Sequence, residues 1–530
     1  MIPIQTISIA DHTTASSPNT HVIYIVKVIL EDGQQYEVQR RYSQFVKLQG
    51  CLRDAYTLPP KHKLSTTVFP LAWIDDQLIT ERKFGLAAYL NHLINIPEFQ
   101  TNTIFTQFLS SQTFDTTSFS EILDNPPAMI SKDLVAIHNA NGNPETNAAP
   151  ISAAYYPTWS ADTNPPHKID FSKFDILFYA FVTPNASSTI SWESGSQDTL
   201  RRLVASARLS GKGTKIVLSI GGWAGCQWFS RATSNATNRT KLTNALVGAV
   251  HSFGLDGVDI DWEYPNSPGA GNPFSSADSA NLLALFKSLR TSLGPSKIIS
   301  SAVAHMPWNG PNGTSLTDVR AFAAQMTYVN IMNYDVNGAS SKPGPNAPLG
   351  NLCGSSSQPR ASAQAALSQW TKAGMPASKL LLGLALYGYV SKSTAKKLSG
   401  SLMPDPSIHP VAHPRSPLQD ISTAPAGDLS NMWGQQIAFK QLVRSGALVK
   451  THDGYRGSNG YTMAWDDCSD TPYLYNVART TVVSYDDTWS LSSKAKFAKK
   501  FGMAGCFTWS LDQDDGDTLQ NVIRLNLGKR

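Results

Sequence analysis

The chain has 530 residues, of which 41% are hydrophobic and 16% charged, and its formal net charge is +5. This length suits two or three ordinary domains, or one large barrel with an added module. No apolar run of about 18 residues occurs, so we expect no transmembrane helix. The charge is mild and no glycine-rich phosphate loop follows a strand, so nucleic acid is not an expected partner.

The amino terminus and the cysteines bear on the compartment. Residues 1–19 contain no basic segment followed by an apolar one, so we expect no secretory signal peptide. The cysteines form no C-x-x-C or His/Cys cluster, so neither a metal site nor another cofactor is predicted. Mostly reduced thiols in a cytosolic protein are the favoured interpretation. The cysteines are Cys51, Cys226, Cys353, Cys468 and Cys506.

Residues 1–112 are expected to form a small α+β domain. Alternating apolar residues over 21–45 indicate strands, and Asp32-Gly33 is typical of a hairpin turn between two of them. Apolar residues then recur at helical spacing and predict an amphipathic helix over 81–96. They are Leu86, Leu90, Leu93 and Ile94.

Basic residues recur at three places in this first domain. The segment QRRYSQF (39–45) ends a strand, LPPKHK (58–63) follows, and Arg82 opens the helix. Any one of them alone would be a solvated surface. Together the order R-R-Y-S-x-F, P-P-K and R-x-x-x-L-x-x-Y resembles the phox-homology (PX) domain, a phosphoinositide-binding module, over residues 1–112.

That resemblance assigns a role to each basic residue. Arg41 would pair with the 3-phosphate as a planar fork, and Tyr42 would pack on the inositol ring. Lys61, or else Lys63, would contact the 1-phosphate, and Arg82 the 4- and 5-hydroxyls. The apolar loop 66–76 would either insert shallowly into an anionic membrane or pack beneath itself.

Residues 113–148 are polar, with several prolines and few periodic apolar positions, and are predicted to be a linker. From 149 to 530, apolar strands alternate with helical segments. Eight such repeats fit a (β/α)8 TIM barrel, with a doubly wound open sheet as the second choice. A long Pro-rich gap predicts an inserted subdomain over about 390–485. The candidate strands are 153–159, 176–182, 215–222, 257–264, 297–305, 328–335, 379–388 and 505–512.

The fourth candidate strand contains the sequence DGVDIDWEYP (256–265). Asp259, Asp261 and Glu263 occupy alternate positions, so their side chains would share one face of the strand. Burying carboxylates without a purpose costs several kcal/mol, which favours a catalytic role for all three. Asp256 is out of phase and is expected to order the start of the strand, while Gly257 would permit tight packing.

The motif DGVDIDWE closely resembles the D-G-x-D-x-D-x-E signature of glycoside hydrolase family 18, the chitinases and their relatives. The segments AYYPTW (154–159), LSIGGW (218–223), MNYD (332–335) and WSLDQDD (509–515) agree with that family in order and spacing. The resemblance covers roughly 150–520. It implies a retaining hydrolysis in which the 2-acetamido group of the sugar is the nucleophile.

The resemblance also implies residue roles. Glu263 would protonate the glycosidic oxygen, Asp261 would orient the acetamide, and Asp259 would share a proton or hydrogen bond with Asp261. Tyr334 would donate to the acetamido oxygen. Neighbouring anions would raise the pKa of Glu263 and keep it protonated. The substrate-binding residues implied are Trp509 as the floor of the −1 site, Asp335, Tyr155, Trp223 and Trp465.

Several alternatives stay open. The domain could be an endo-β-N-acetylglucosaminidase acting on N-glycans, or a non-catalytic chitin-binding lectin, although the retained acids argue against a lectin. Trp465 and Tyr473 in the insert could line the cleft or equally pack the insert. The expected partners are therefore chitin or N-acetylglucosamine oligomers and a phosphoinositide-containing membrane.

The two halves predict different compartments. A phosphoinositide reader needs the cytosolic leaflet, in the cytoplasm or on endosomes, whereas chitinases usually act outside the cell. Four N-x-S/T sequons would matter only in a secreted protein, and a fusion of two neighbouring reading frames is a further interpretation. The sequons begin at Asn185, Asn235, Asn238 and Asn312.

Overall fold

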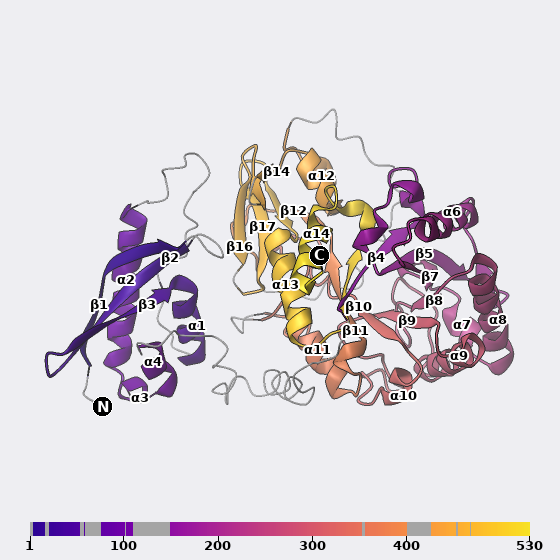
Figure 1. Cartoon of the computed structure of the whole chain (residues 1–530), viewed down its shortest axis with the longest axis horizontal. Coiled ribbons are helices and arrows are strands. Elements are labelled where there is room, and N and C mark those ends of the chain that lie inside the picture. The colour runs from indigo at the N-terminus through magenta and orange to yellow at the C-terminus, as the bar shows by residue number, and fades with distance from the viewer. Residues whose placement is uncertain are drawn as a thin grey trace. The chain divides into compact units, whose positions relative to one another are not determined.

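The fold is taken from a computed structural model, which describes residues 4–15, 21–52, 58, 76–100, 102–109, 149–351, 356–399, 426–451, 454–466 and 468–529. The chain divides into two compact units, residues 1–135 and 136–530, which are described separately (Figure 1). Within the described residues, no helix is both long and apolar enough to cross a bilayer.

The first unit is a three-stranded antiparallel sheet packed against helices, in strand order β1-β2-β3. The expected hairpin at Asp32-Gly33 is confirmed: it joins β2 to β3, and Gly33 adopts a positive φ of 83° that suits glycine. The strands are β1 (Ile4–Ala15), β2 (His21–Leu30) and β3 (Gln35–Arg41), and the helices are α1 (Tyr42–Leu52), α2 (Asp76–Ile94), α3 (Pro97–Gln100) and α4 (Thr103–Phe108).

Helix α2 contains the amphipathic segment expected from the sequence. Its apolar positions Leu86, Leu90 and Leu93 are fully buried and pack against the sheet residues Tyr24 and Val26 in one core. Burying such a stripe on the sheet is what stabilises a helix of this kind in a small domain.

The second unit is a closed parallel barrel. Eight strands run in the order β4-β19-β11-β10-β9-β8-β7-β5, and pairing of β4 with β5 closes the ring, which excludes the doubly wound open sheet. A short strand β6 (Ile190–Ser191) pairs antiparallel with β5. The barrel strands are β4 (Ile151–Pro157), β5 (Ile176–Pro184), β7 (Lys215–Gly221), β8 (Gly257–Asp261), β9 (Ile298–Val303), β10 (Tyr328–Ile331), β11 (Leu380–Ala385) and β19 (Gly505–Trp509).

Helices surround the barrel (Figure 1). The α-helices are α6 (Ser196–Leu209), α7 (Phe229–Thr233), α8 (Ala236–Phe253), α9 (Asp278–Leu293), α10 (Arg320–Ala323), α11 (Ala363–Lys372), α13 (Thr488–Lys500) and α14 (Thr518–Leu527). Short 3-10 turns lie in the connections between these elements. They are η2 (Thr158–Ser160), η3 (Pro166–Lys168), η4 (Phe171–Lys173), η5 (Trp223–Gly225), η6 (Ala377–Lys379), η8 (Ser430–Met432) and η9 (Leu511–Gln513).

The start of β8 is fixed by Asp256 and Gly257, as expected. Asp256 accepts a hydrogen bond from the Ile216 backbone N–H (2.9 Å) and pairs with Arg208 (3.1 Å) and Lys215 (3.5 Å). At Gly257 a Cβ atom would lie 2.0 Å from the carbonyl oxygen of Ile298, so only glycine fits there. These contacts set the register of β8 between β7 and β9.

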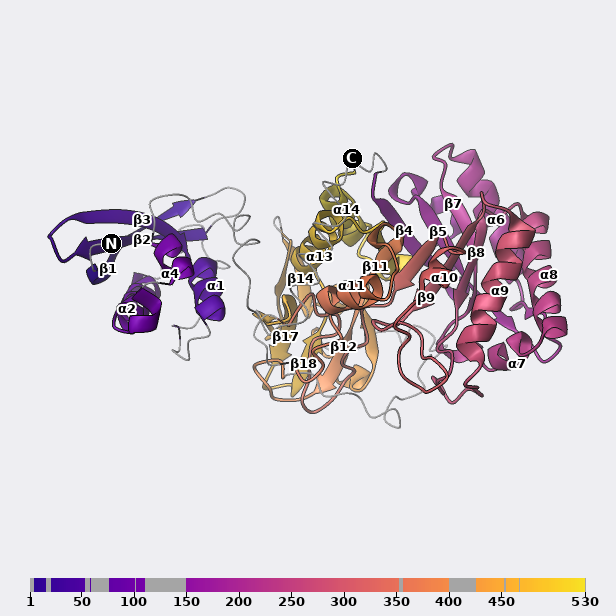
Figure 2. The ribbon, with the colours of Figure 1, turned by 90° about the horizontal axis from the view of Figure 1, so that it is seen from below.

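A second sheet is inserted between β11 and β19, in the order β13-β12-β18-β17-β16, and Figure 2 shows it as a layer on one side of the barrel. This confirms the predicted insertion. Its strands are β12 (Tyr387–Lys392), β13 (Gln436–Ala438), β16 (Thr462–Asp466), β17 (Thr471–Asn476) and β18 (Thr481–Ser484); β14 (Leu448–Thr451) and β15 (Gly454–Gly457) form a hairpin beside α12 (Phe439–Arg444).

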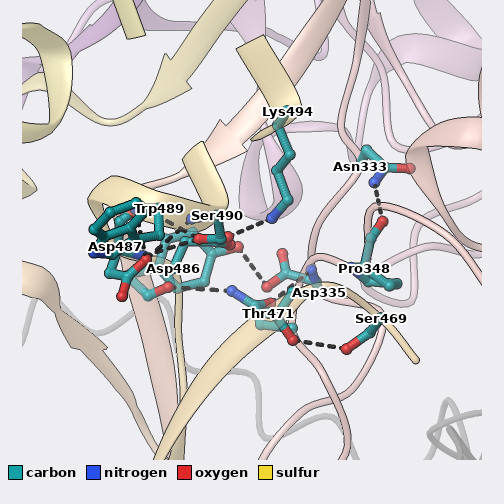
Figure 3. A network of polar contacts seen from close by, with 12 residues as sticks. Asn333, Asp335, Pro348, Ser469, Thr471, Asp486, Asp487, Trp489, Ser490 and Lys494 are labelled. Carbon is teal, nitrogen blue, oxygen red and sulfur yellow. Dashed lines mark hydrogen bonds and ion pairs between the residues drawn. The ribbon is translucent and has the colours of Figure 1, made fainter. Parts of the chain in front are cut away.

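The chain returns from the insert to the barrel through a buried polar segment, drawn in Figure 3. Asp486 and Lys494 form an ion pair in which both side chains are 1% exposed. Asp487 caps helix α13 by accepting the backbone N–H groups of Trp489 (2.8 Å) and Ser490 (3.0 Å). This segment therefore locks the last helix before β19 against the insert.

The cysteines depart in one respect from the expectation of mostly reduced thiols. Cys226 and Cys506 are free and buried in the barrel. Cys468, in the insert, is disulfide-bonded. Disulfides persist mainly in oxidising compartments, so Cys468 does not share the behaviour expected of a cytosolic thiol.

Candidate active site

The alternating acids of β8 end inside the mouth of the barrel. Asp259, Asp261 and Glu263 are 0%, 3% and 9% exposed. Asp259 and Asp261 lie within the strand, where Asp259 is in register with Ser219 of β7 and Ser300 of β9. Glu263 lies two residues beyond the end of the strand. The parallel sheet thus places the three carboxyl groups in succession from the barrel interior towards its opening.

Asp259 is surrounded by hydrogen-bond donors from four other strands. Its Oδ2 accepts from Tyr155 OH (2.9 Å) and Ser219 Oγ (2.7 Å), and its Oδ1 accepts from Ser300 Oγ (2.7 Å) and Asn330 Nδ2 (3.2 Å). Burial raises the pKa of Asp259, while the bonds from the serines and Tyr155 oppose that rise. A carboxylate that accepts four donors is suited to carrying a negative charge.

Asp261 lies in a less polar environment. Its Oδ1 is buried and has no hydrogen-bond partner, so this oxygen makes no bond to Asp259. The oxygens of Asp259 are already occupied by the four donors. The pKa of Asp261 is raised well above its usual value, first by burial, then by the charge of Glu263 and then by the charge of Asp259. Of the two aspartates, Asp261 is therefore the one suited to holding a proton.

Glu263 has the acid strength expected of a proton donor, but for a different reason. Burial raises its pKa to about 8, the negative charge of Asp335 contributes next, and a hydrogen bond from Tyr264 lowers it. From the sequence, neighbouring anions on the same strand were expected to cause this rise in the pKa of Glu263. The structure instead assigns it first to burial and then to an acid on the loop after β10.

The backbone of Glu263 is held by a thiol and by a close glycine. Its N–H donates to Cys226 Sγ (3.2 Å), and the single S–H of that thiol is shared between the carbonyls of Gly222 (3.2 Å) and Asp261 (3.3 Å). A Cβ atom at Gly269 would lie 2.0 Å from the carbonyl oxygen of Glu263. The acid is therefore fixed from both sides of its peptide unit.

Aromatic rings line the region beside these acids. Trp509, at the end of β19, lies 5.4 Å from the ring of Tyr155 and stacks on Phe181 at 5.7 Å between centroids. Trp159 lies 6.3 Å from Trp509 and is 55% exposed. Tyr334 is partly buried, with its pKa raised by burial and then by the charge of Asp261. The site thus joins three acids to an aromatic surface that reaches solvent.

The remaining predicted substrate residues are placed differently. Trp223 opens the turn η5 after β7 and is partly exposed. Trp465 lies on β16, the edge strand farthest from β13 in the inserted sheet. Tyr473 is buried and donates to the carbonyl of Lys396 (2.9 Å), which favours packing of the insert for that residue.

The first unit brings together part of the predicted lipid site. Arg41, at the end of β3, has an exposed side chain, and its backbone N–H donates to Gln44 Oε1 (2.7 Å). Arg82 is buried, with its guanidinium 5.5 Å from the ring centre of Tyr42. Arg40 is buried instead and donates to the carbonyl of Phe108 (2.8 Å), so it is structural. Lys61, Lys63 and the loop 66–76 lie outside the described residues.

Comparison with known proteins identifies both units. Residues 151–514 match the family described as glycosyl hydrolases family 18. The chain belongs to this family. Residues 29–112 match the PX domain, so a PX domain precedes the family 18 domain.

Relatives of the family 18 domain carry different descriptions. A chitinase-like effector from Moniliophthora roreri is 34% identical over 400 residues, which is 73% of this chain and 95% of the relative. The crystal structure of a chitinase from Rhizomucor miehei is 32% identical, with a TM-score of 0.59 over 71% of this chain and 99% of that one. Chitinase A1 from Niallia circulans is 29% identical over 324 residues, 59% of this chain and 42% of the relative.

Sequence reasoning missed several residues of the family 18 site. Ser219 and Ser300 lie within quoted strands, and only the register of the barrel places them on Asp259. No sequence signal predicted a role for Trp159. Cys226 was expected only to be a reduced thiol. Tyr389 and Gln436 belong to the insert, and no local signal connects them to the acids.

Proposed function

We propose that the family 18 domain is a chitinase that hydrolyses β-1,4 bonds between N-acetylglucosamine units with retention of configuration. The observation that carries the proposal is Glu263, a nearly buried acid at the barrel mouth whose pKa is raised to about 8. Such a group is protonated at neutral pH and can donate its proton to a leaving group. The neighbouring Asp261 supports a substrate-assisted route over a direct nucleophilic carboxylate.

The reaction runs in two steps. Glu263 donates its proton to the glycosidic oxygen while the acetamido carbonyl oxygen attacks the anomeric carbon, so the C–O bond breaks and an oxazolinium ion forms. Asp261 orients the acetamide, Tyr334 donates to its oxygen, and Trp509 forms the floor under the sugar. Water then attacks the anomeric carbon and breaks its bond to the acetamido oxygen, which regenerates the acetamide and the original configuration, and the water gives its proton to Glu263 and so restores the acid.

The test compares the wild-type protein with Glu263→Gln on N-acetylglucosamine oligomers, with Asp198→Asn, an exposed acid on α6, as the control. We expect the Gln variant to lose activity by about 10²-fold or more, the scale of general acid catalysis. Product anomers followed by NMR should show retention. Turnover of Glu263→Gln at the wild-type rate would refute the assignment.

The Moniliophthora roreri relative is described only as a chitinase-like effector, so we keep a non-catalytic chitin-binding lectin as the second candidate. If wild type and Glu263→Gln both bound oligomers with equal affinity and neither cleaved them, the lectin would be supported instead. Cleavage of N-glycan cores without cleavage of chitin oligomers would support an endo-β-N-acetylglucosaminidase.

We propose that the PX domain binds phosphoinositide membranes through Arg41, Tyr42 and Arg82, together with Lys61 or Lys63. The exposed guanidinium of Arg41 and the placement of Arg82 over Tyr42 support this. Arg41→Ala should abolish binding to liposomes that contain phosphatidylinositol 3-phosphate. Lys27→Ala removes an equal charge from β2 of the same sheet and should bind normally. Equal binding by Arg41→Ala and wild type would contradict the site.

A further inference from the structure

The carboxylate of Asp335 receives an unusual number of donors. Its Oδ1 accepts from Tyr387 OH (2.5 Å), Tyr389 OH (2.6 Å) and Gln436 Nε2 (3.4 Å). Its backbone N–H donates to Asn346 Oδ1 (2.9 Å). Asp335 is nevertheless exposed and has a positive φ of 58°. An exposed carboxylate normally rotates freely, so these donors give it a defined position.

All three donors come from the inserted sheet. Tyr387 and Tyr389 are alternate residues of β12 and so share one face, and Gln436 is the β13 residue paired with Tyr389. Gln436 Nε2 also donates to Tyr389 OH (2.8 Å). The tyrosine therefore accepts from the glutamine and donates to the carboxylate, which directs both groups towards Asp335.

We propose that Tyr389 and Gln436 are positioning residues, through which the inserted sheet fixes the charge of Asp335 beside the acid Glu263. This inference rests on the proposed acid role of Glu263. Coulomb interactions depend on distance and on local screening, so a carboxylate free to rotate into solvent would act on Glu263 less strongly. The insert would then contribute to the acid strength of Glu263, which belongs to the barrel.

The other titratable groups around Asp335 do not replace its charge. Tyr264 interacts with it from the segment after β8, Tyr334 from its own loop, and Tyr387 and Tyr389 from β12. Burial raises the pKa values of these tyrosines well above the usual value, so they stay neutral. Asp486 and Lys494, drawn in the same polar network in Figure 3, compensate each other as an ion pair.

The experiment measures the pH profile of kcat/KM on chitin oligomers for Tyr389→Phe and Gln436→Leu. Both variants should move the alkaline limb to lower pH, by roughly 0.5 unit, because a weaker negative charge makes Glu263 easier to deprotonate. Matched controls are Tyr475→Phe on β17 and Gln435→Leu beside Gln436, and both should keep the wild-type limb. The shift should vanish when either variant is combined with Asp335→Asn, since the effect acts through that carboxylate.

A second readout separates this inference from the proposed function. The carboxyl groups are titrated by 13C NMR in the wild type and in Glu263→Gln, and the signal present only in the wild type is that of Glu263. This measurement reports the ionisation of Glu263 and needs no substrate. A normal carboxyl titration in the wild type would refute the acid assignment itself. The positioning role would be overturned if the pKa of Glu263 were raised in the wild type but unchanged in Tyr389→Phe and Gln436→Leu. It would also be overturned if these variants changed that pKa even when combined with Asp335→Asn.

Discussion

Removing the positive charge from the buried Asp486–Lys494 pair should destabilise the family 18 unit strongly. Both side chains are 1% exposed, and Asp486 Oδ2 has no hydrogen-bond partner of its own. Lys494→Met keeps most of the side-chain volume and leaves Asp486 as an uncompensated buried charge. Breaking a buried pair from one side costs about 3–5 kcal/mol.

The expected change in melting temperature follows from the size of the unit, residues 136–530. At ~2.1 cal/mol/K per residue its unfolding entropy is roughly 0.8 kcal/mol/K, so the variant should melt about 4–6 °C lower. The double variant Asp486→Leu with Lys494→Met removes both charges and should recover most of that loss, because a buried ion pair is often replaceable by apolar residues.

Differential scanning calorimetry on the full chain measures both effects. Lys496→Met, an exposed lysine of the same helix α13, controls for the loss of a lysine as such and should melt like the wild type. The reasoning would be refuted if Lys494→Met melted within about 1 °C of the control, or if the double variant were no more stable than the single one.

Three further predictions concern the site. Cys226→Ala removes the sulfur that binds the Glu263 N–H, and it should lower kcat about 10-fold, some 1.4 kcal/mol, with KM nearly unchanged. Cys226→Ser should retain more activity than Cys226→Ala. Equal kcat values for Cys226→Ala and the wild type in oligomer hydrolysis would contradict this prediction. Because the active form of Glu263 is protonated and its pKa is about 8, kcat/KM should fall above pH 8, and a fall complete by pH 6 would exclude this acid. Trp159→Ala should weaken binding of long oligomers by about 1 kcal/mol without affecting the shortest ones, as measured by calorimetric titration.

The barrel and its three β8 acids could be predicted because both leave local signals. Buried parallel strands are continuous apolar runs, and period-2 acids in such a run are conspicuous. The environment of those acids could not be predicted in the same way. Whether Asp259 bonds to Asp261 or to Ser219 and Ser300 depends on the register of three strands, which no single segment encodes.

The acidity of Glu263 illustrates the same limit. The charge that supports it belongs to Asp335, and the donors on Asp335 come from a sheet inserted after β11. In the first unit, Arg40 and Arg41 are adjacent and chemically equal in the sequence. They point to opposite faces of β3, and the fold of the domain decides which face is covered: Arg40 is buried and donates to the Phe108 carbonyl, whereas Arg41 is exposed.

The barrel closes where its last strand, β19, pairs with its first strand, β4, and we call this pairing the seam. The aromatic rings of Tyr155 and Trp509 lie on its two sides. Tyr155 is supplied by the first strand and Trp509 by the last, and their rings meet at 5.4 Å across that seam. A chain cut before residue 505 would keep Asp259, Asp261 and Glu263 but lose Trp509, the proposed floor of the sugar site. If Trp509 has that role, sugar binding would report that the two ends of the barrel have met, which no assay of the β8 acids alone could reveal.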